Sequence, residues 1–149
     1  MNPQPYLQIY YETHDEDTRL TSRTGQIEYL TTMRYIEKYL HDGMRILEIG
    51  AATGRYSHAL ARRGYRVDAV ELVQHNIDIF REKTLPGEDV TIRQGNAKDL
   101  SFFEDETFDM VLLLGPMYHL FAVNEQRQAL AEALRVTKKG GIFMAAYCG

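Results

Sequence analysis

A buried strand that ends in a glycine turn, followed by a strand that closes in a carboxylate, constrains this chain more than any other feature. An apolar run over residues 44–49 leads into a turn from Gly50 to Gly54, and the next apolar run closes at Glu71. Glycine admits a close backbone approach to a ligand, because no Cβ occupies that space. A carboxylate about 20 residues further along is placed to accept both hydroxyls of a ribose. The pattern predicts a nucleoside-containing cofactor.

Strand-type and helix-type patterns alternate along the rest of the chain. The strands are predicted at residues 44–49, 67–72, 90–92, 108–114 and 142–147, the last after a turn at residues 140–141. Two of the helices are expected to begin at Thr24 and Asn124 as N-caps. Their expected buried faces include Ile27, Leu30 and Leu134. This alternation predicts an α/β fold with a doubly wound, mostly parallel sheet.

The carboxyl ends of the strands are where ligands bind in sheets of this kind. This rule selects residues 50–54, 71–72, 94–97 and 114–119 as candidate site segments. A dinucleotide fingerprint is the first alternative for the turn, and it needs glycines at the first, third and sixth positions. Those positions hold Gly50, Ala52 and Arg55. Because an arginine obstructs the close helix–strand packing of the third glycine, a nucleotide-dependent oxidoreductase is the less favoured enzyme class.

The composition of the chain limits the classes of partner that we expect. The chain has 149 residues, which fits one domain, divided here into an N-terminal helical segment (1–43) and a core (44–149). A net charge of −4 without a basic run argues against a nucleic-acid partner. No apolar stretch approaches membrane-spanning length, and the single cysteine, Cys148, fits a reducing compartment. The histidines show no paired metal-ligand spacing. We therefore expect a cytoplasmic protein without a membrane partner or a metal.

The motifs resemble those of class I S-adenosylmethionine-dependent methyltransferases. The similar segments are residues 46–54, Glu71, residues 95–97 and residues 108–109, in family order and spacing within residues 44–147. The resemblance implies a Rossmann-like sheet in the order 3-2-1-4-5-7-6, with S-adenosylmethionine as cofactor. It implies a lid formed by the N-terminal segment, with a helix that packs its tyrosines on the sheet as the alternative. It also implies methyl transfer. We expect a small-molecule acceptor, and whether oxygen, nitrogen or carbon is methylated stays open.

The resemblance assigns a set of cofactor-binding residues on the glycine loop and at the strand ends. They are Glu48, Gly50, Ala51, Gly54, Glu71, Leu72, Asn96, Ala97 and Leu114. The loop is expected to face the methionyl part and Glu71 the ribose, while Asn96 and Ala97 line the adenine. Glu48 lies inside a strand, where a carboxylate is costly unless paired. It is expected to accept hydrogen bonds from loop amides or the cofactor's ammonium, with a partly solvated strand-end acid as the alternative.

Candidate catalytic residues follow the fourth strand. Tyr118 is expected to wall the acceptor pocket, and His119 to act as a general base, with a packing or capping histidine as the alternative. Amino-group methyltransferases of the family carry Asp or Asn, Pro, Pro and an aromatic residue here. Gly115 and Met117 depart from that pattern, which weakens a base- or amide-methylating activity.

Two further departures from the family are visible. Ala52 stands where the middle glycine of the loop usually lies. Strands six and seven are apparently lacking, so we expect a fragment of a longer chain. The apolar strand at residues 142–147 would then form a sheet edge, through which a homodimer is possible. A catalytically incomplete cofactor-binding module, or an inactive partner subunit, is therefore the non-enzymatic alternative.

Overall fold

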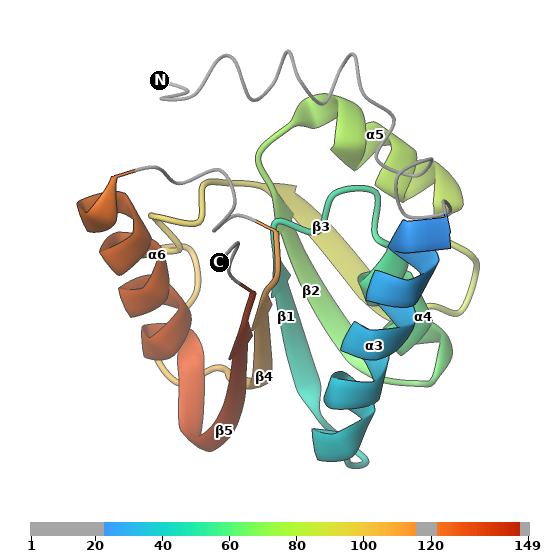
Figure 1. Ribbon diagram of the computed structural model, residues 1–149, viewed down its shortest axis with the longest axis horizontal. Helices are drawn as coiled ribbons and strands as arrows, with labels where there is room; N and C mark the ends of the chain where they lie inside the picture. Colours follow the sequence, from blue (N-terminus) through green and yellow to red (C-terminus); the bar gives the residue numbers. More distant parts are fainter. Residues whose placement is uncertain (1–22, 116–121, 147–149) are drawn as a thin grey trace.

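The computed structural model describes residues 23–115 and 122–146. Within them, five strands form one sheet in the order β3-β2-β1-β4-β5, and every neighbouring pair is parallel (Figure 1). The strands are β1 (Arg45–Ile49), β2 (Arg66–Glu71), β3 (Val90–Gln94), β4 (Phe108–Leu113) and β5 (Thr137–Ala145). The helices are α3 (Arg23–Tyr39), α4 (Arg55–Arg62), α5 (Gln74–Lys83) and α6 (Val123–Val136). This order confirms the predicted doubly wound α/β fold.

The core lies on both faces of the central strands. Side chains alternate between the faces of β1 and β4, so each strand feeds two apolar clusters. The cluster under α6 contains Leu47, Ile49, Val111, Leu113, Ala129 and Ala133. The cluster under α3 and α4, on the opposite face in Figure 1, contains Met33, Ile36, Ile46, Leu60, Met110 and Leu112. Burial on both faces explains why these strands read as nearly continuous apolar runs.

Three residues that we expected in the core are exposed instead. Ile27, Leu30 and Leu134 have exposed fractions of 59%, 60% and 58%. α3 buries one narrow stripe through Met33 and Ile36, and both Ile27 and Leu30 lie off it. Leu134 is turned about 100° round α6 from the buried residue before it. The stripe of apolar residues in the sequence of each helix is therefore wider than the face that the helix buries against the sheet.

The expected N-caps are also wrong. Thr24 lies inside α3, and Asn124 lies inside α6. The N-cap of α6 is Ala122, whose backbone is extended and whose carbonyl accepts a 3.1 Å hydrogen bond from the amide of Gln126. That first bond starts the helix before Asn124, so Asn124 is not the N-cap residue.

β5 begins earlier than the sequence predicts. Thr137 pairs with Phe108 and Ile142 with Met110, and the register is irregular between them. The predicted glycine turn lies inside this irregularity, where Gly140 has φ +77° and the ribbon reverses direction in Figure 1. A Cβ on Gly141 would lie 2.8 Å from a carbonyl oxygen of the same turn, so the reversal requires glycine there.

Candidate functional site

The glycine loop leaves β1 while still bonded to the end of β2. The amides of Gly50 and Ala51 both donate to the carbonyl of Val70, at 2.8 and 3.1 Å. Gly50 has φ +74° and Ala52 has φ +52°. A side chain in this left-handed region costs roughly 1–2 kcal/mol. The conformation explains why glycine is usual at the Ala52 position, and it shows that this chain keeps the loop shape in spite of the strain.

Gly54 closes the loop where two aromatic rings meet. Its φ is +95°, and a Cβ there would lie 2.4 Å from the ring of Phe80 and 2.7 Å from that of His58. The two rings pack with centroids 4.4 Å apart, and the His58 ring also contacts the carboxylate of Glu88 at 3.2 Å. α4 begins at the next residue. Gly54 therefore lets the loop and α4 lie directly on α5, and any side chain there would push them apart.

Glu71 joins the loop to the end of β2. Its Oε1 accepts the amide of Ala52 at 3.0 Å, and its Oε2 accepts the amide of Val73 at 3.1 Å. Oε2 also accepts the side-chain amide of Asn76 at 3.0 Å. Glu71 is 5% exposed. These three donors orient the carboxylate at the end of β2, directly beside the glycine loop.

Asn76 is a site residue that the sequence reasoning missed. It lies in the first turn of α5 and is 1% exposed. The available signal was a polar residue just before Ile77, on the face of the helix that the apolar pattern marks as buried. A buried amide needs a partner, and the nearest strand-end carboxylate was the one to look for.

Glu48 is buried beside the loop. It is 2% exposed and accepts a 2.6 Å hydrogen bond from the hydroxyl of Ser57 in α4. Burial raises the pKa of Glu48 to about 8, opposed by the Ser57 bonds and assisted by the charge of Glu71. The partly solvated alternative is wrong. These hydrogen bonds come from Ser57 in α4 rather than from an amide of the glycine loop, so a contact with the cofactor's ammonium stays a prediction.

The predicted adenine corner lies beside these groups. The amide of Gly95 donates to the carbonyl of Glu71 at 3.1 Å, which ties the end of β3 to the end of β2. Asn96 shapes the turn that follows, because its Oδ1 accepts the amide of Lys98 and its carbonyl accepts that of Asp99. Asn96 and Ala97 are half-buried. The carbonyl of Leu72, also half-buried, accepts Gln94 Nε2 at 3.0 Å.

The end of β4 meets the glycine loop. A Cβ on Gly115 would lie 3.5 Å from the carbonyl oxygen of Gly50, so the two backbones are close neighbours. Leu114 is half-buried and packs on the cluster under α3 and α4. Tyr118 and His119 lie outside the described residues, and their catalytic roles stay predictions. The structure thus brings the nine expected cofactor-binding residues to one region at the carboxyl edge of the sheet.

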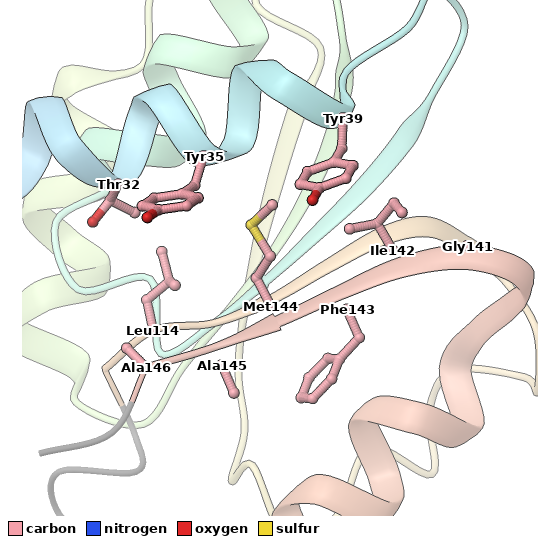
Figure 2. Close-up of a pocket in the computed structure, with 10 residues that line it drawn as sticks. All are labelled: Thr32, Tyr35, Tyr39, Leu114, Gly141, Ile142, Phe143, Met144, Ala145 and Ala146. Atoms are coloured by element: carbon pink, nitrogen blue, oxygen red, sulfur yellow. The ribbon is translucent and has the colours of Figure 1, made fainter. Parts of the chain in front are cut away.

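A separate pocket of about 670 Å³ lies between α3 and β5. Figure 2 shows Tyr35 and Tyr39 of α3 facing Ile142 and Met144 of β5 across it. Of the expected site residues it contains Leu114. In the described part of the chain, no helix has the length and apolarity that a membrane crossing requires. The same residues contain no group of three or more histidine, cysteine or acidic side chains suited to a metal ion.

Comparison with known proteins identifies related chains. A family model described as "Methyltransferase domain" matches residues 47–145. Over 94% of the present chain, it is 31% identical to a cypemycin N-terminal methyltransferase of Streptomyces sp. Over 84% of the present chain, it is 36% identical to a demethylmenaquinone methyltransferase of Clavibacter sepedonicus. It covers 55% and 49% of these two proteins, so it spans about half their length.

A solved structure adds a bound ligand to the comparison. CalS10, an amino pentose methyltransferase of Micromonospora echinaspora, was determined with S-adenosylmethionine bound. The chain is 26% identical to it, with a TM-score of 0.68 over 82% of this chain and 50% of CalS10.

Proposed function

The chain belongs to the S-adenosylmethionine-dependent methyltransferases, and on that premise we propose that it binds S-adenosylmethionine at the glycine loop and transfers a methyl group to a small-molecule acceptor. The resemblance read from the sequence, its Rossmann-like fold and its cofactor are confirmed at the level of the family. The roles of individual residues and the acceptor belong to the proposal.

One observation carries the assignment of the cofactor site. The carboxylate of Glu71 accepts the amide of Ala52, so the glycine loop and the strand-end acid form one connected surface. A ribose needs a buried acceptor beside a backbone without side chains, and Glu71 with Gly50 and Gly54 supplies both. Asn96 and Ala97 follow the end of the neighbouring strand, β3, which is where the family resemblance places the adenine.

The bound cofactor supplies an activated methyl group, so the protein's part is alignment and exclusion of water. In the proposal, Glu71 holds the ribose hydroxyls, and the loop from Gly50 to Gly54 receives the methionyl part. The residues after β4 begin against that loop, which supports an acceptor position there. His119 would take a proton from an acceptor hydroxyl, and Tyr118 would wall the pocket.

The acceptor is proposed as a class only. The related proteins are named for cypemycin, demethylmenaquinone and an amino pentose, which are chemically different compounds. A small organic molecule is common to most of these names, and the choice between oxygen, nitrogen and carbon stays open.

Calorimetric titration with S-adenosylhomocysteine tests the cofactor site directly. We expect stoichiometric binding to the wild-type chain and none to Glu71→Ala. Glu82→Ala is the matched control, because Glu82 is an exposed glutamate of the adjoining helix α5. NADH serves as the control ligand. A folded wild-type chain that binds NADH and not S-adenosylhomocysteine contradicts the proposal and restores the oxidoreductase alternative.

The non-enzymatic alternative is a module that binds the cofactor without turnover. The apolar residues along β5 and the pocket beside them favour it, because a chain that pairs there would complete the site. Incubation with radiolabelled S-adenosylmethionine and a panel of quinones, amines and amino sugars separates the two. Labelled product supports the enzyme. Binding without any transfer, together with a dimeric mass in solution, supports the module and the predicted homodimer.

A further inference from the structure

An ion pair on α6 holds both polar groups of one backbone residue, Leu100. Oε2 of Glu132 accepts the Leu100 amide at 2.6 Å, and an Nη2 hydrogen of Arg135 is donated to the Leu100 carbonyl at 2.8 Å. The same two side chains bond each other at 2.8 and 3.1 Å. A bidentate arginine–carboxylate pair is geometrically rigid. Because it bonds both the amide and the carbonyl of Leu100, it fixes the backbone of this residue relative to α6.

The pair also fixes the residues after Leu100. Nη1 of Arg135 donates to the carbonyl of Phe103 at 2.9 Å and to the carboxylate of Asp105 at 2.8 Å. The Asp105 side chain is 72% exposed, so that contact contributes little. The hydrogen bonds from Arg135 hold the pKa of Glu132 below its ordinary value, which keeps the carboxylate ionised near neutrality. Glu132 and Arg135 therefore act as a permanent charged clamp.

The clamped segment continues directly from the predicted adenine corner. Leu100 is 0% exposed and packs in the same apolar cluster against which Ala97 rests. Between them the chain makes the tight turn from Asn96 to Asp99, closed by a 2.9 Å backbone hydrogen bond. Leu100 directly follows this turn, and the two ends of the turn, Asn96 and Asp99, are bonded to each other, so a shift of Leu100 displaces Asn96 as well. The position of the corner is thus set from α6.

We propose that Arg135 and Glu132 are positioning residues for adenine recognition, acting through Leu100 on the corner at Asn96 and Ala97. This inference rests on the proposed function, since it takes the cofactor to lie at the carboxyl edge of the sheet. Neither side chain needs to touch the cofactor. Their effect is to hold the adenine-facing backbone where it meets the edge of the base.

The test compares two ligands that differ at the edge of the base. S-adenosylhomocysteine carries an amino group where S-inosylhomocysteine carries an oxygen, and the ribose and tail are identical. In Arg135→Gln, we expect affinity for S-adenosylhomocysteine to fall about tenfold, as loss of charged hydrogen bonds implies. The ratio of the two affinities should fall with it. Arg127→Gln is the matched control, because Arg127 is an exposed arginine on the same helix.

Two more conservative substitutions test the inference if the Arg135→Gln variant does not fold. Arg135→Lys keeps the charge and the aliphatic stem, but one ammonium does not reproduce the planar fork, so the ratio should still fall. Glu132→Gln keeps an acceptor for the Leu100 amide and should lower the ratio less than the Arg135 variants do. Thermal melts establish that each variant is folded at the titration temperature.

The possible outcomes distinguish a failure of this inference from a failure of the proposed function on which it rests. A wild-type chain that is folded and binds neither ligand overturns the proposed function, and the inference falls with it. Binding that depends on Glu71 while the Arg135 variants match Arg127→Gln overturns the inference alone. An equal loss for both ligands also overturns it, because that result indicates general loosening of the fold. A selective loss for the adenine ligand supports it.

Discussion

Two buried glutamates lie on neighbouring strands beside the same loop, and their surroundings differ. Glu71, at the end of β2, is 5% exposed and accepts hydrogen bonds from Ala52, Val73 and Asn76. Glu48, inside β1, is 2% exposed and accepts a hydrogen bond from the Ser57 hydroxyl, and burial raises its pKa to about 8.

The difference teaches that donors, rather than burial, decide what a buried carboxylate can do. Several N–H donors favour the ionised form, which is the form that accepts ligand hydroxyls. At Glu48, where the hydrogen bonds come from Ser57, desolvation prevails and the neutral acid is favoured. Replacing each glutamate by glutamine makes the same isosteric change in the two settings. The outcomes should be opposite.

Glu71→Gln should give the largest effect. Glutamine has one acceptor oxygen where the carboxylate has two, so its NH₂ group faces at least one of the N–H donors that now bond Glu71, and the charge facing the ribose is lost. We expect S-adenosylhomocysteine to bind roughly 100-fold more weakly, and the unfolding free energy to drop by about 1–3 kcal/mol. Calorimetry and urea denaturation measure the two. Unchanged affinity would remove Glu71 from the cofactor site.

Glu48→Gln should stabilise the chain, and increasingly so as pH rises. The folded state binds more protons than the unfolded state between the ordinary glutamate pKa of 4.5 and about 8, so wild-type stability falls with pH across that window. Glutamine removes this loss. The gain in unfolding free energy should be near zero at pH 4.5 and on the order of 2–4 kcal/mol at pH 8. Urea denaturation across this range measures it, and a gain independent of pH contradicts the assignment.

Asn76→Leu should weaken cofactor binding by about tenfold, through loss of the charged hydrogen bond that orients Glu71. The side chain is buried, so leucine keeps the apolar packing of α5. Gln74→Leu, at an exposed position of the same helix, is the control. If Asn76→Leu binds S-adenosylhomocysteine as the control does, then the Asn76 side chain is not needed to orient the Glu71 carboxylate.

Ser57→Ala should have the smallest effect, a loss of about 1 kcal/mol in unfolding free energy. The hydroxyl donates to Glu48, and its hydrogen bond opposes the rise of that pKa. Its removal should therefore extend the pH-dependent loss of stability to higher pH. Urea denaturation of the variant between pH 7 and 9 detects this. Identical pH profiles for the variant and the wild type would show that another group supports Glu48.

The sheet was the most predictable part of the molecule. Each interior strand is largely apolar, and the alternation of strands with helices predicts the fold that the structure shows. The glycine turn with Glu71 predicts a site at the carboxyl edge of this sheet. What the sequence did not reveal depends on contacts between distant residues. The bond between Arg135 and the Leu100 carbonyl spans 35 positions, and no local pattern marks it. Whether an apolar residue such as Leu30 is buried depends on which neighbour covers it, and periodicity does not report that.

The position of β1 has a consequence for synthesis of the chain. Among the strands that the structure describes, the central one, β1, is made first, and its contact with β4, between Arg45 and Asp109, spans 64 residues. At ribosomal rates of about 5–20 residues per second, β1 waits roughly 3–13 s for that neighbour. β2 and β3 emerge earlier and pair on the other side, so the nascent chain passes through a half-sheet with an unpaired apolar edge on β1. We expect a chaperone to bind the nascent chain mainly at this stage, because the apolar edge of β1 is then unpaired.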